Sequence, residues 1–467
     1  MTDPVLSNAW RGETAAGPFS PAAGRWAVRA VQPGVTTAAP PEHDPWDWRA
    51  PQVGWGLVLA DTDRFSVADL VAAKDAPEPL QDLVAARGPA PVLRWRPGQP
   101  DVLLRYYPGF ADPETIPIGG TPRGIVDGAI PSFLMLWGGL DRLPWRLQYA
   151  LNLDPRIFVG RLPAMSDDAL QSYVTALLGE WDAPPPAHAQ ALVWATDHRP
   201  ADISRLMRLI VAEPVRAAYE TDADITVQSL GGPDATAAQL AATLAAQSPD
   251  MIVSTSHGFT GPEGAPDRER LGWLVDAELE PADPATLLAG WQPDGAIWYA
   301  HACCGAGSDS PSTFAGLFEK DSSLDRMLTE VAGLGSLVAP LPIALLSACR
   351  PLRAFVGHIE PTYDWTIRDR PSQHALTADL VTALYDHLML GRPVGWALNS
   401  FHLRSGAEAA ALDDARGDVL AGHAEADTAL APRLRFLDRR SLVVLGDPAV
   451  ALPSTAGAPP LVPTPGS

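Results

Sequence analysis

The chain has 467 residues, with 34 Lys and Arg against 55 Asp and Glu, so its formal charge is −21. A surface this acidic repels phosphate backbones and argues against nucleic acid as a partner. Three cysteines are too few for a disulfide framework, and neither a secretion signal nor an apolar membrane span is evident, which predicts a cytoplasmic protein without a membrane partner.

The first part of the chain divides into two regions. Residues 1–100 are rich in Pro and Ala, and we predict no clear role for them. Residues 101–185 predict a small α/β subdomain, because short apolar runs precede an amphipathic helix that begins after Ser166. The linker Pro184-Pro185-Pro186 ends this region. The strands predicted here are Val102–Tyr107, Phe133–Trp137 and Ile157–Gly160.

Residues 186–452 predict a larger subdomain of alternating strands and helices, and residues 453–467 predict a disordered, proline-rich tail. The predicted strands are Ala191–Thr196, Met251–Thr255, Ala296–Ala300, Arg353–Gly357 and Ser441–Leu445. The predicted helices are Ile203–Tyr219, kinked near Pro214, then Thr236–Gln247 and Ala375–Leu390. This alternation is typical of an α/β fold with a largely parallel sheet. We expect two such sheets, separated near residue 185.

Two of the predicted strands are followed by residues whose side chains can take part in catalysis. His257 and Gly258 follow the strand Met251–Thr255, and Cys303 follows the strand Ala296–Ala300. Ligands of open α/β sheets gather beyond the carboxyl ends of the strands, so we expect the imidazole and the thiol to meet there. A thiol beside an imidazole is the minimum for a nucleophile and its proton partner.

The two segments, MIVSTSHG and AIWYAHAC, resemble the His-Gly and Ala-Cys blocks of the caspase-like cysteine peptidases. Within that superfamily the likeness is closest to gingipain-type and CHAT-domain proteases. The segments FLMLWGGLDRLPW, RIFVGRLPAMSDDALQSYVTALLGEW, RAFVGHIEPTYDW and SLVVLGDPAVAL resemble further blocks of these proteins, in the expected order. The chain departs from the pattern in its second cysteine, Cys304, and in His301, where caspases carry Gln.

The resemblance implies a caspase-like parallel-sheet α/β sandwich, in which a smaller α/β subdomain precedes the catalytic one. It implies Cys303 as the nucleophile and His257 as the general acid and base. The backbone N–H groups of Gly258 and Cys303 would hold the oxyanion. No cofactor and no metal are implied.

Other assignments of the same residues remain open. Cys304 fits the description of a buried thiol without a chemical role, since free cysteine is among the most buried residue types. Cys349 follows a Leu-Ser-Ala run, as CHAT-type nucleophiles often do. His257, His301, Cys303 and Cys304 could instead bind zinc, although adjacent cysteines are poor ligands for one tetrahedral ion.

Members of the family recognise the substrate partly through the loop after the first strand of the catalytic sheet. In this loop Asp197 or Asp202 would favour a basic side chain, whereas Arg199 would favour an acidic one. We favour the basic preference, because gingipain-like proteins carry an acid here; both acids also suit a cap of the following helix. Trp365 is a candidate apolar wall of the substrate pocket, and Glu360 a residue at its border.

These features together predict a cytosolic cysteine endopeptidase that cleaves protein or peptide substrates through an acyl-enzyme. We expect its control by a regulatory protein partner, an inhibitory segment or self-processing. The alternative is a catalytically inactive, caspase-like scaffold for protein–protein interaction.

Overall fold

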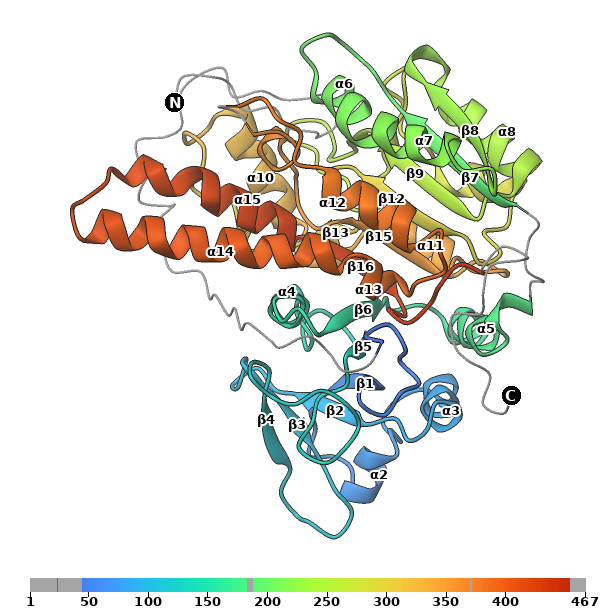
Figure 1. Ribbon diagram of the computed structural model, residues 1–467, viewed down its shortest axis with the longest axis vertical. Coiled ribbons are helices and arrows are strands. Elements are labelled where there is room, and N and C mark those ends of the chain that lie inside the picture. The colour runs from blue at the N-terminus through green and yellow to red at the C-terminus, as the bar shows by residue number, and fades with distance from the viewer. Residues whose placement is uncertain (1–22, 24–43, 183–187, 370–371, 454–467) are drawn as a thin grey trace.

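The computed structural model describes residues 44–182, 188–369 and 372–453, together with Ala23. Its centre is a mostly parallel sheet of twelve strands in the order β4-β3-β2-β1-β5-β6-β16-β15-β12-β9-β7-β8, flanked by helices (Figure 1). The fold is therefore α/β and consistent with a caspase-like sandwich. The predicted tail lies outside the described residues, apart from Pro453.

The strands of the large sheet are β1 (Trp55–Ala60), β2 (Val92–Trp95), β3 (Val102–Arg105), β4 (Glu114–Pro117), β5 (Phe133–Trp137), β6 (Phe158–Leu162), β7 (Ala189–Ala195), β8 (Ile225–Gly231), β9 (Met251–Thr255), β12 (Ile297–His301), β15 (Ala354–His358) and β16 (Leu442–Gly446). Two short hairpin-like pairs lie apart from it: β10 (His257–Gly258) with β11 (Leu274–Val275), and β13 (Gly307–Ser308) with β14 (Leu337–Val338). The strands predicted from apolar runs are confirmed, with ends shifted by at most two residues.

The helices are α2 (Val67–Val71), α3 (Glu78–Ala86), α4 (Trp145–Asn152), α5 (Asp167–Leu178), α6 (Ile203–Met207), α7 (Glu213–Glu220), α8 (Ala237–Gln247), α9 (Pro284–Ala289), α10 (Ser323–Gly333), α11 (Pro340–Leu346), α12 (Ala378–Val381), α13 (Val394–Ala397), α14 (Asn399–Leu420) and α15 (Leu430–Arg440). Helices α14 and α15 form a hairpin that projects from the body (Figure 1). None of the helices in the described ranges is both long and apolar enough to cross a membrane.

The expectation of two separate sheets is wrong, because one sheet runs through both subdomains. Strand β16 pairs antiparallel with β15 of the C-terminal half and parallel with β6 of the N-terminal half. An unpaired strand edge is a site of unwanted association, and this pairing removes two edges at once. One apolar core likewise includes Leu57 of β1, Val444 of β16 and Trp194 of β7, which lie on both sides of this junction and at it.

The region for which the sequence predicted no role supplies part of this sheet. Strands β1 and β2 and helices α2 and α3 all lie before residue 100, and β1 pairs in parallel with both β2 and β5. The predicted helix over Ile203–Tyr219 has the predicted interruption. Its π-helical segment Arg208–Ala212 separates α6 from α7 just before Pro214, which cannot donate a backbone hydrogen bond.

Candidate functional site

The candidate site lies at the carboxyl ends of β9 and β12, which are adjacent and parallel. Thr255, the last residue of β9, pairs with His301, the last residue of β12. His257 and Cys303 each follow two residues later, so the chain segments that carry them leave the sheet together. An added Cβ at Gly258 would lie 1.8 Å from the Cys303 carbonyl oxygen, which shows how closely the two backbones approach.

The imidazole of His257 is buried against a carboxylate. Its Nε2 lies 2.8 Å from Oδ1 of Asp202, and both side chains are 1% exposed. Asp202 is also the N-cap of α6, where it accepts a hydrogen bond of 2.9 Å from the Ser204 amide. Burial alone would raise the pKa of Asp202, but the His257 ring and the Ser204 donor together hold that pKa well below its usual range.

These contacts leave one nitrogen of His257 for chemistry. Nδ1 is buried and has no hydrogen-bond partner among the described residues. A carboxylate on one ring nitrogen fixes the tautomer and the orientation, so that the other nitrogen can accept or donate a proton.

A second imidazole lies flat against the first. The rings of His198 and His257 are 5.0 Å apart between centroids, with an interplanar angle of 6°. His198, Asp202 and His257 form the one group in the described ranges whose ligand atoms are close enough to share a metal ion. However, the lone pairs of two parallel rings lie in separate planes, so both nitrogens cannot point at one ion unless a ring turns. The geometry does not favour a metal centre.

Cys303 is fully buried in an apolar cluster of the protein interior. Its Sγ accepts a hydrogen bond of 3.2 Å from the amide of Thr362, a donor that suits a thiolate. Buried neighbours in the same cluster include Leu271, Phe314, Tyr363 and Trp365. The side-chain contacts described for Cys303 and for His257 are thus made to different residues, although their backbones adjoin.

Of the other two cysteines, Cys304 shares the burial and the apolar cluster of Cys303, whereas Cys349 does not. Cys304 is buried, and burial raises the pKa of its thiol well above the ordinary value, with smaller contributions from Cys303 and Glu360. Cys349 is exposed beyond the end of α11. Burial does not distinguish Cys304 from Cys303, and the choice of Cys303 as nucleophile stays a prediction.

His301 belongs to a separate buried cluster. Its Nδ1 lies 2.8 Å from the Tyr299 hydroxyl, and its ring lies edge-on to His358 at 5.0 Å. Burial lowers the pKa of His301 to about 4, so the ring is neutral near pH 7. It is not in the metal-sized group that contains His257.

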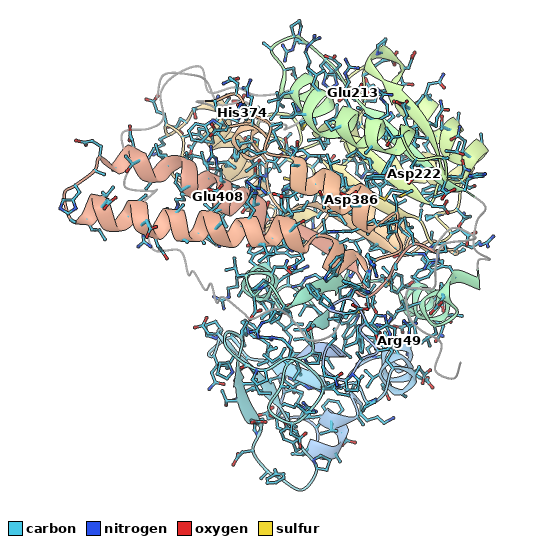
Figure 2. The ribbon with its side chains drawn as sticks, in the orientation of Figure 1. Arg49, Glu213, Asp222, His374, Asp386 and Glu408 are labelled. Carbon is cyan, nitrogen blue, oxygen red and sulfur yellow. The ribbon has the colours of Figure 1, made fainter. Side chains whose placement is uncertain are left out.

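The predicted substrate-binding acids both have partners within the protein. Asp197 pairs with Arg205 at 3.5 Å and with Arg208 at 3.3 Å, and Arg208 also pairs with Glu213 at the start of α7 (Figure 2). Asp202, besides its contacts to His257 and Ser204, lies 3.6 Å from Arg199. The predicted cap is thus made by Asp202, and the substrate preference stays a prediction.

The remaining substrate-binding predictions concern Glu360 and Trp365. Both Glu360 carboxylate oxygens accept hydrogen bonds from the Thr313 amide at 3.1 Å. Burial raises the pKa of Glu360 to about 7, against the effect of its hydrogen-bond donors. Trp365 is 2% exposed and lies in the cluster that contains Cys303. Their roles toward substrate stay predictions.

Sequence reasoning missed three participants: His198, the Thr362 amide, and the role of Asp202 beside His257. The helix-cap pattern was a signal for the position of Asp202, but not for its contact with the imidazole. His198 lies in the same loop and carries no motif of its own, and an amide donor has no sequence signature.

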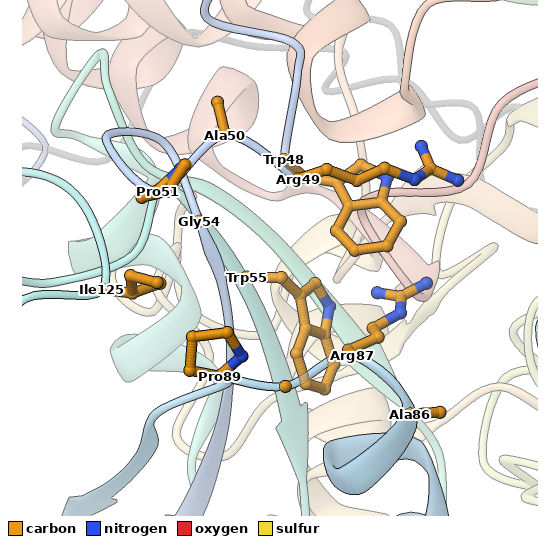
Figure 3. Close-up of a pocket in the computed structure, with 11 residues that line it drawn as sticks. Trp48, Arg49, Ala50, Pro51, Gly54, Trp55, Ala86, Arg87, Pro89 and Ile125 are labelled. Atoms are coloured by element: carbon orange, nitrogen blue, oxygen red, sulfur yellow. The ribbon is translucent and has the colours of Figure 1, made fainter. Parts of the chain in front are cut away.

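A pocket of about 220 Å³ lies in the N-terminal half, on residues outside the candidate site (Figure 3). The guanidinium of Arg87 stacks on both Trp48 and Trp55, with 4.3 and 4.7 Å to the ring centroids. It also pairs with the buried Asp447 at 2.7 Å. Arg49 at the rim pairs with Glu180 at 2.9 Å (Figure 2). Both guanidinium groups therefore already have anionic partners within the protein, which is typical of ion pairs that hold the fold together.

Comparison with known proteins does not identify a family for this chain. No family model and no curated protein matches the chain. One solved structure, described as "Structure of Protease", is similar with a TM-score of 0.39 and 12% identity. The match covers 70% of this chain and 66% of that chain, just under two thirds of its length.

Proposed function

We propose that the chain is a cysteine-type endopeptidase of the caspase-like kind. The observation that carries the proposal is the placement of His257 and Cys303 directly after two adjacent parallel strands, with the buried Asp202 on one nitrogen of the imidazole. A histidine with one oriented nitrogen and one free nitrogen is the arrangement that proton transfer to and from a nucleophile needs.

In the proposed reaction, Cys303 transfers its thiol proton to Nδ1 of His257, and Sγ then bonds to the carbonyl carbon of the scissile peptide. The carbonyl π electrons move to oxygen, where the N–H groups of Gly258 and Cys303 would stabilise the negative charge. When the C–N bond breaks, His257 returns the proton to the leaving amine. Water then attacks the thioester, loses a proton to His257, and releases the acid and the thiol.

The register of the small β10–β11 pair supports the part given to Gly258. The Phe259 amide donates to the Trp273 carbonyl, and Gly258 pairs with Leu274 at the next position. Hydrogen-bonded and non-bonded pairs alternate along antiparallel strands, so the Gly258 N–H points away from β11. The β10–β11 pair therefore does not use this N–H, which the proposal assigns to the substrate oxygen.

Asp202 is given the role of a positioning residue in this proposal. Asp202→Asn keeps the shape of the side chain but removes the charge that faces the imidazolium, so we expect the turnover of a peptide library to fall about 100-fold or more. Asp197→Asn is the matched control in the same loop, since Asp197 contacts arginines rather than His257. Equal losses in both variants would contradict the assignment.

The nucleophile is tested by alkylation of the full chain with an iodoacetamide probe and mapping of the labelled cysteine. We expect Cys303 to be labelled faster than a free thiol, with a pH dependence that is lost in His257→Ala, and Cys303→Ala to abolish cleavage of the library. Cys349→Ala, which removes the exposed thiol, should leave cleavage unchanged. Labelling of Cys303 no faster than a free thiol, with no cleavage, would favour the inactive scaffold.

A further inference from the structure

The surroundings of His198 determine which of its ring nitrogens carries a hydrogen and favour its neutral form. Its Nε2 lies 2.7 Å from the carbonyl oxygen of Asp276, and a carbonyl can only accept, so Nε2 carries the hydrogen. Nδ1 is buried without a hydrogen-bond partner among the described residues. A second proton on Nδ1 would place an unpaired donor in the interior, which favours the neutral ring.

The carbonyl that anchors His198 is itself fixed. The Asp276 carboxylate accepts backbone hydrogen bonds of 2.8 to 2.9 Å from Ala237, Glu278 and Glu280. Asp276 directly follows β11, the partner strand of β10, which begins with His257. The short β10–β11 unit therefore fixes both the imidazole and the acceptor that holds the neighbouring ring.

The neutral face of His198 lies parallel to His257. An aromatic face carries negative electrostatic potential, so it attracts a cation placed against it. Protonation of His257 would thus be favoured from two directions, in the ring plane by Asp202 and across the ring face by His198. Two further charged groups are described beside this set: Arg199, 3.6 Å from Asp202, and the carboxylate of Asp276, which favours a positive charge on His198 and so opposes its neutral form.

We propose that His198 is a positioning residue that holds the His257 ring in its plane and stabilises its protonated form through the stacked face. The proposal rests on the proposed function, in which His257 carries a proton between the thiol and the leaving amine. It assigns His198 no contact with substrate. One loop, between β7 and α6, then supplies both supports of the imidazole.

The test uses the full chain with selectively labelled histidine and follows the His257 ring by NMR as the pH is changed. His198→Leu removes the aromatic face, and we expect the His257 ring signals at a fixed pH near neutrality to move toward those of the neutral ring. His198→Phe keeps the face without the ring nitrogens and should leave these signals near their original positions. His257→Ala identifies the signal, and circular dichroism checks that each variant is folded.

The same variants are assayed for peptide cleavage across pH. We expect the limb of the pH–rate profile that reports His257 to move to lower pH in His198→Leu, and to stay near its original position in His198→Phe. Unchanged His257 ring signals in folded His198→Leu, or equal changes in both variants, overturn the inference. Absence of cleavage in the unmodified chain, with the expected NMR shifts, overturns the proposed function and leaves the role of the stack standing.

Discussion

At the scale of single residues, two acids of one loop show that their contacts in the fold, rather than their residue type, determine what each can do. Asp197 and Asp202 are five residues apart, and either would serve as a helix cap or a charge for substrate. In the fold, Asp202 contacts His257, whereas Asp197 contacts two arginines of the following helical segment. The motif around His257 could be read from the sequence. Its partner could not, because the partner depends on the path of a loop about 55 residues earlier.

Glu360 gives a residue-scale prediction about stability and pH. Burial raises its pKa to about 7 in the folded chain, above the ordinary value of 4.5. Between these values the folded state holds a proton that the unfolded state has lost, so the contribution of Glu360 to stability is present below this window and is lost as pH rises through it. Relative to Glu360→Gln, we expect the unmodified chain to lose about 3 kcal/mol across this range.

Urea unfolding of both proteins at pH 5 and pH 8 measures this difference. The exposed Glu319 provides a control, since Glu319→Gln should leave the pH dependence unchanged. If Glu360→Gln shows the same pH slope as the unmodified chain, the carboxyl of Glu360 is ionised in the folded state throughout the window.

At the scale of elements, sequence prediction succeeded where burial produces a simple pattern. Strands β5 and β9 coincide with their apolar runs, because both faces of a central parallel strand are buried. Helix α14 was not predicted, since its buried face carries mostly small or polar side chains and has no apolar stripe. The buried residues of α14 are Phe401, His402, Ser405, Gly406, Ala409 and Leu412. Edge strand β8 was not predicted, because most of its residues are half-buried or exposed and form no apolar run.

The contact between β10 and the end of β12 gives a prediction at this scale. In Gly258→Ala the new Cβ would lie 1.8 Å from the Cys303 carbonyl oxygen and 3.0 Å from its nitrogen, so the backbone must shift. Under the proposed function this displaces an oxyanion donor, and we expect turnover to fall about 100-fold or more, with a lower melting temperature. Gly333→Ala, where an added Cβ has no neighbour within 4 Å, should change neither quantity by a comparable amount. Full activity in folded Gly258→Ala would exclude Gly258 from the oxyanion site.

At the scale of the whole molecule, the joining of the two halves was beyond the sequence patterns. Gly160 and Gly446 meet across the β6–β16 pair, where an added Cβ at Gly160 would lie 2.3 Å from the Gly446 carbonyl oxygen. Each glycine is readable as a turn or strand end, but their contact joins positions almost 290 residues apart. Local periodicity contains no information about such a pairing, which explains why two sheets were expected and one is found.

The ion pair between Arg87 and Asp447 tests whether the halves unfold together. Arg87 follows α3 in the N-terminal half, and Asp447 directly follows β16; their side chains are 7% and 0% exposed. Asp447→Asn leaves a buried guanidinium without its counter-charge, so we expect the free energy of unfolding to fall by about 3 kcal/mol or more. Glu180→Gln breaks the exposed pair with Arg49 and should cost less than about 1 kcal/mol.

Denaturant unfolding followed by fluorescence and circular dichroism measures both variants. Because the sheet and the core are continuous across the halves, we expect one transition in the unmodified chain, and in Asp447→Asn the same single transition at lower denaturant. A double variant with Arg87→Met removes the stranded charge as well, so its loss should be smaller than the sum of the two single losses. Two separate transitions, with only the N-terminal one moved by Asp447→Asn, would show that the shared sheet does not couple the halves.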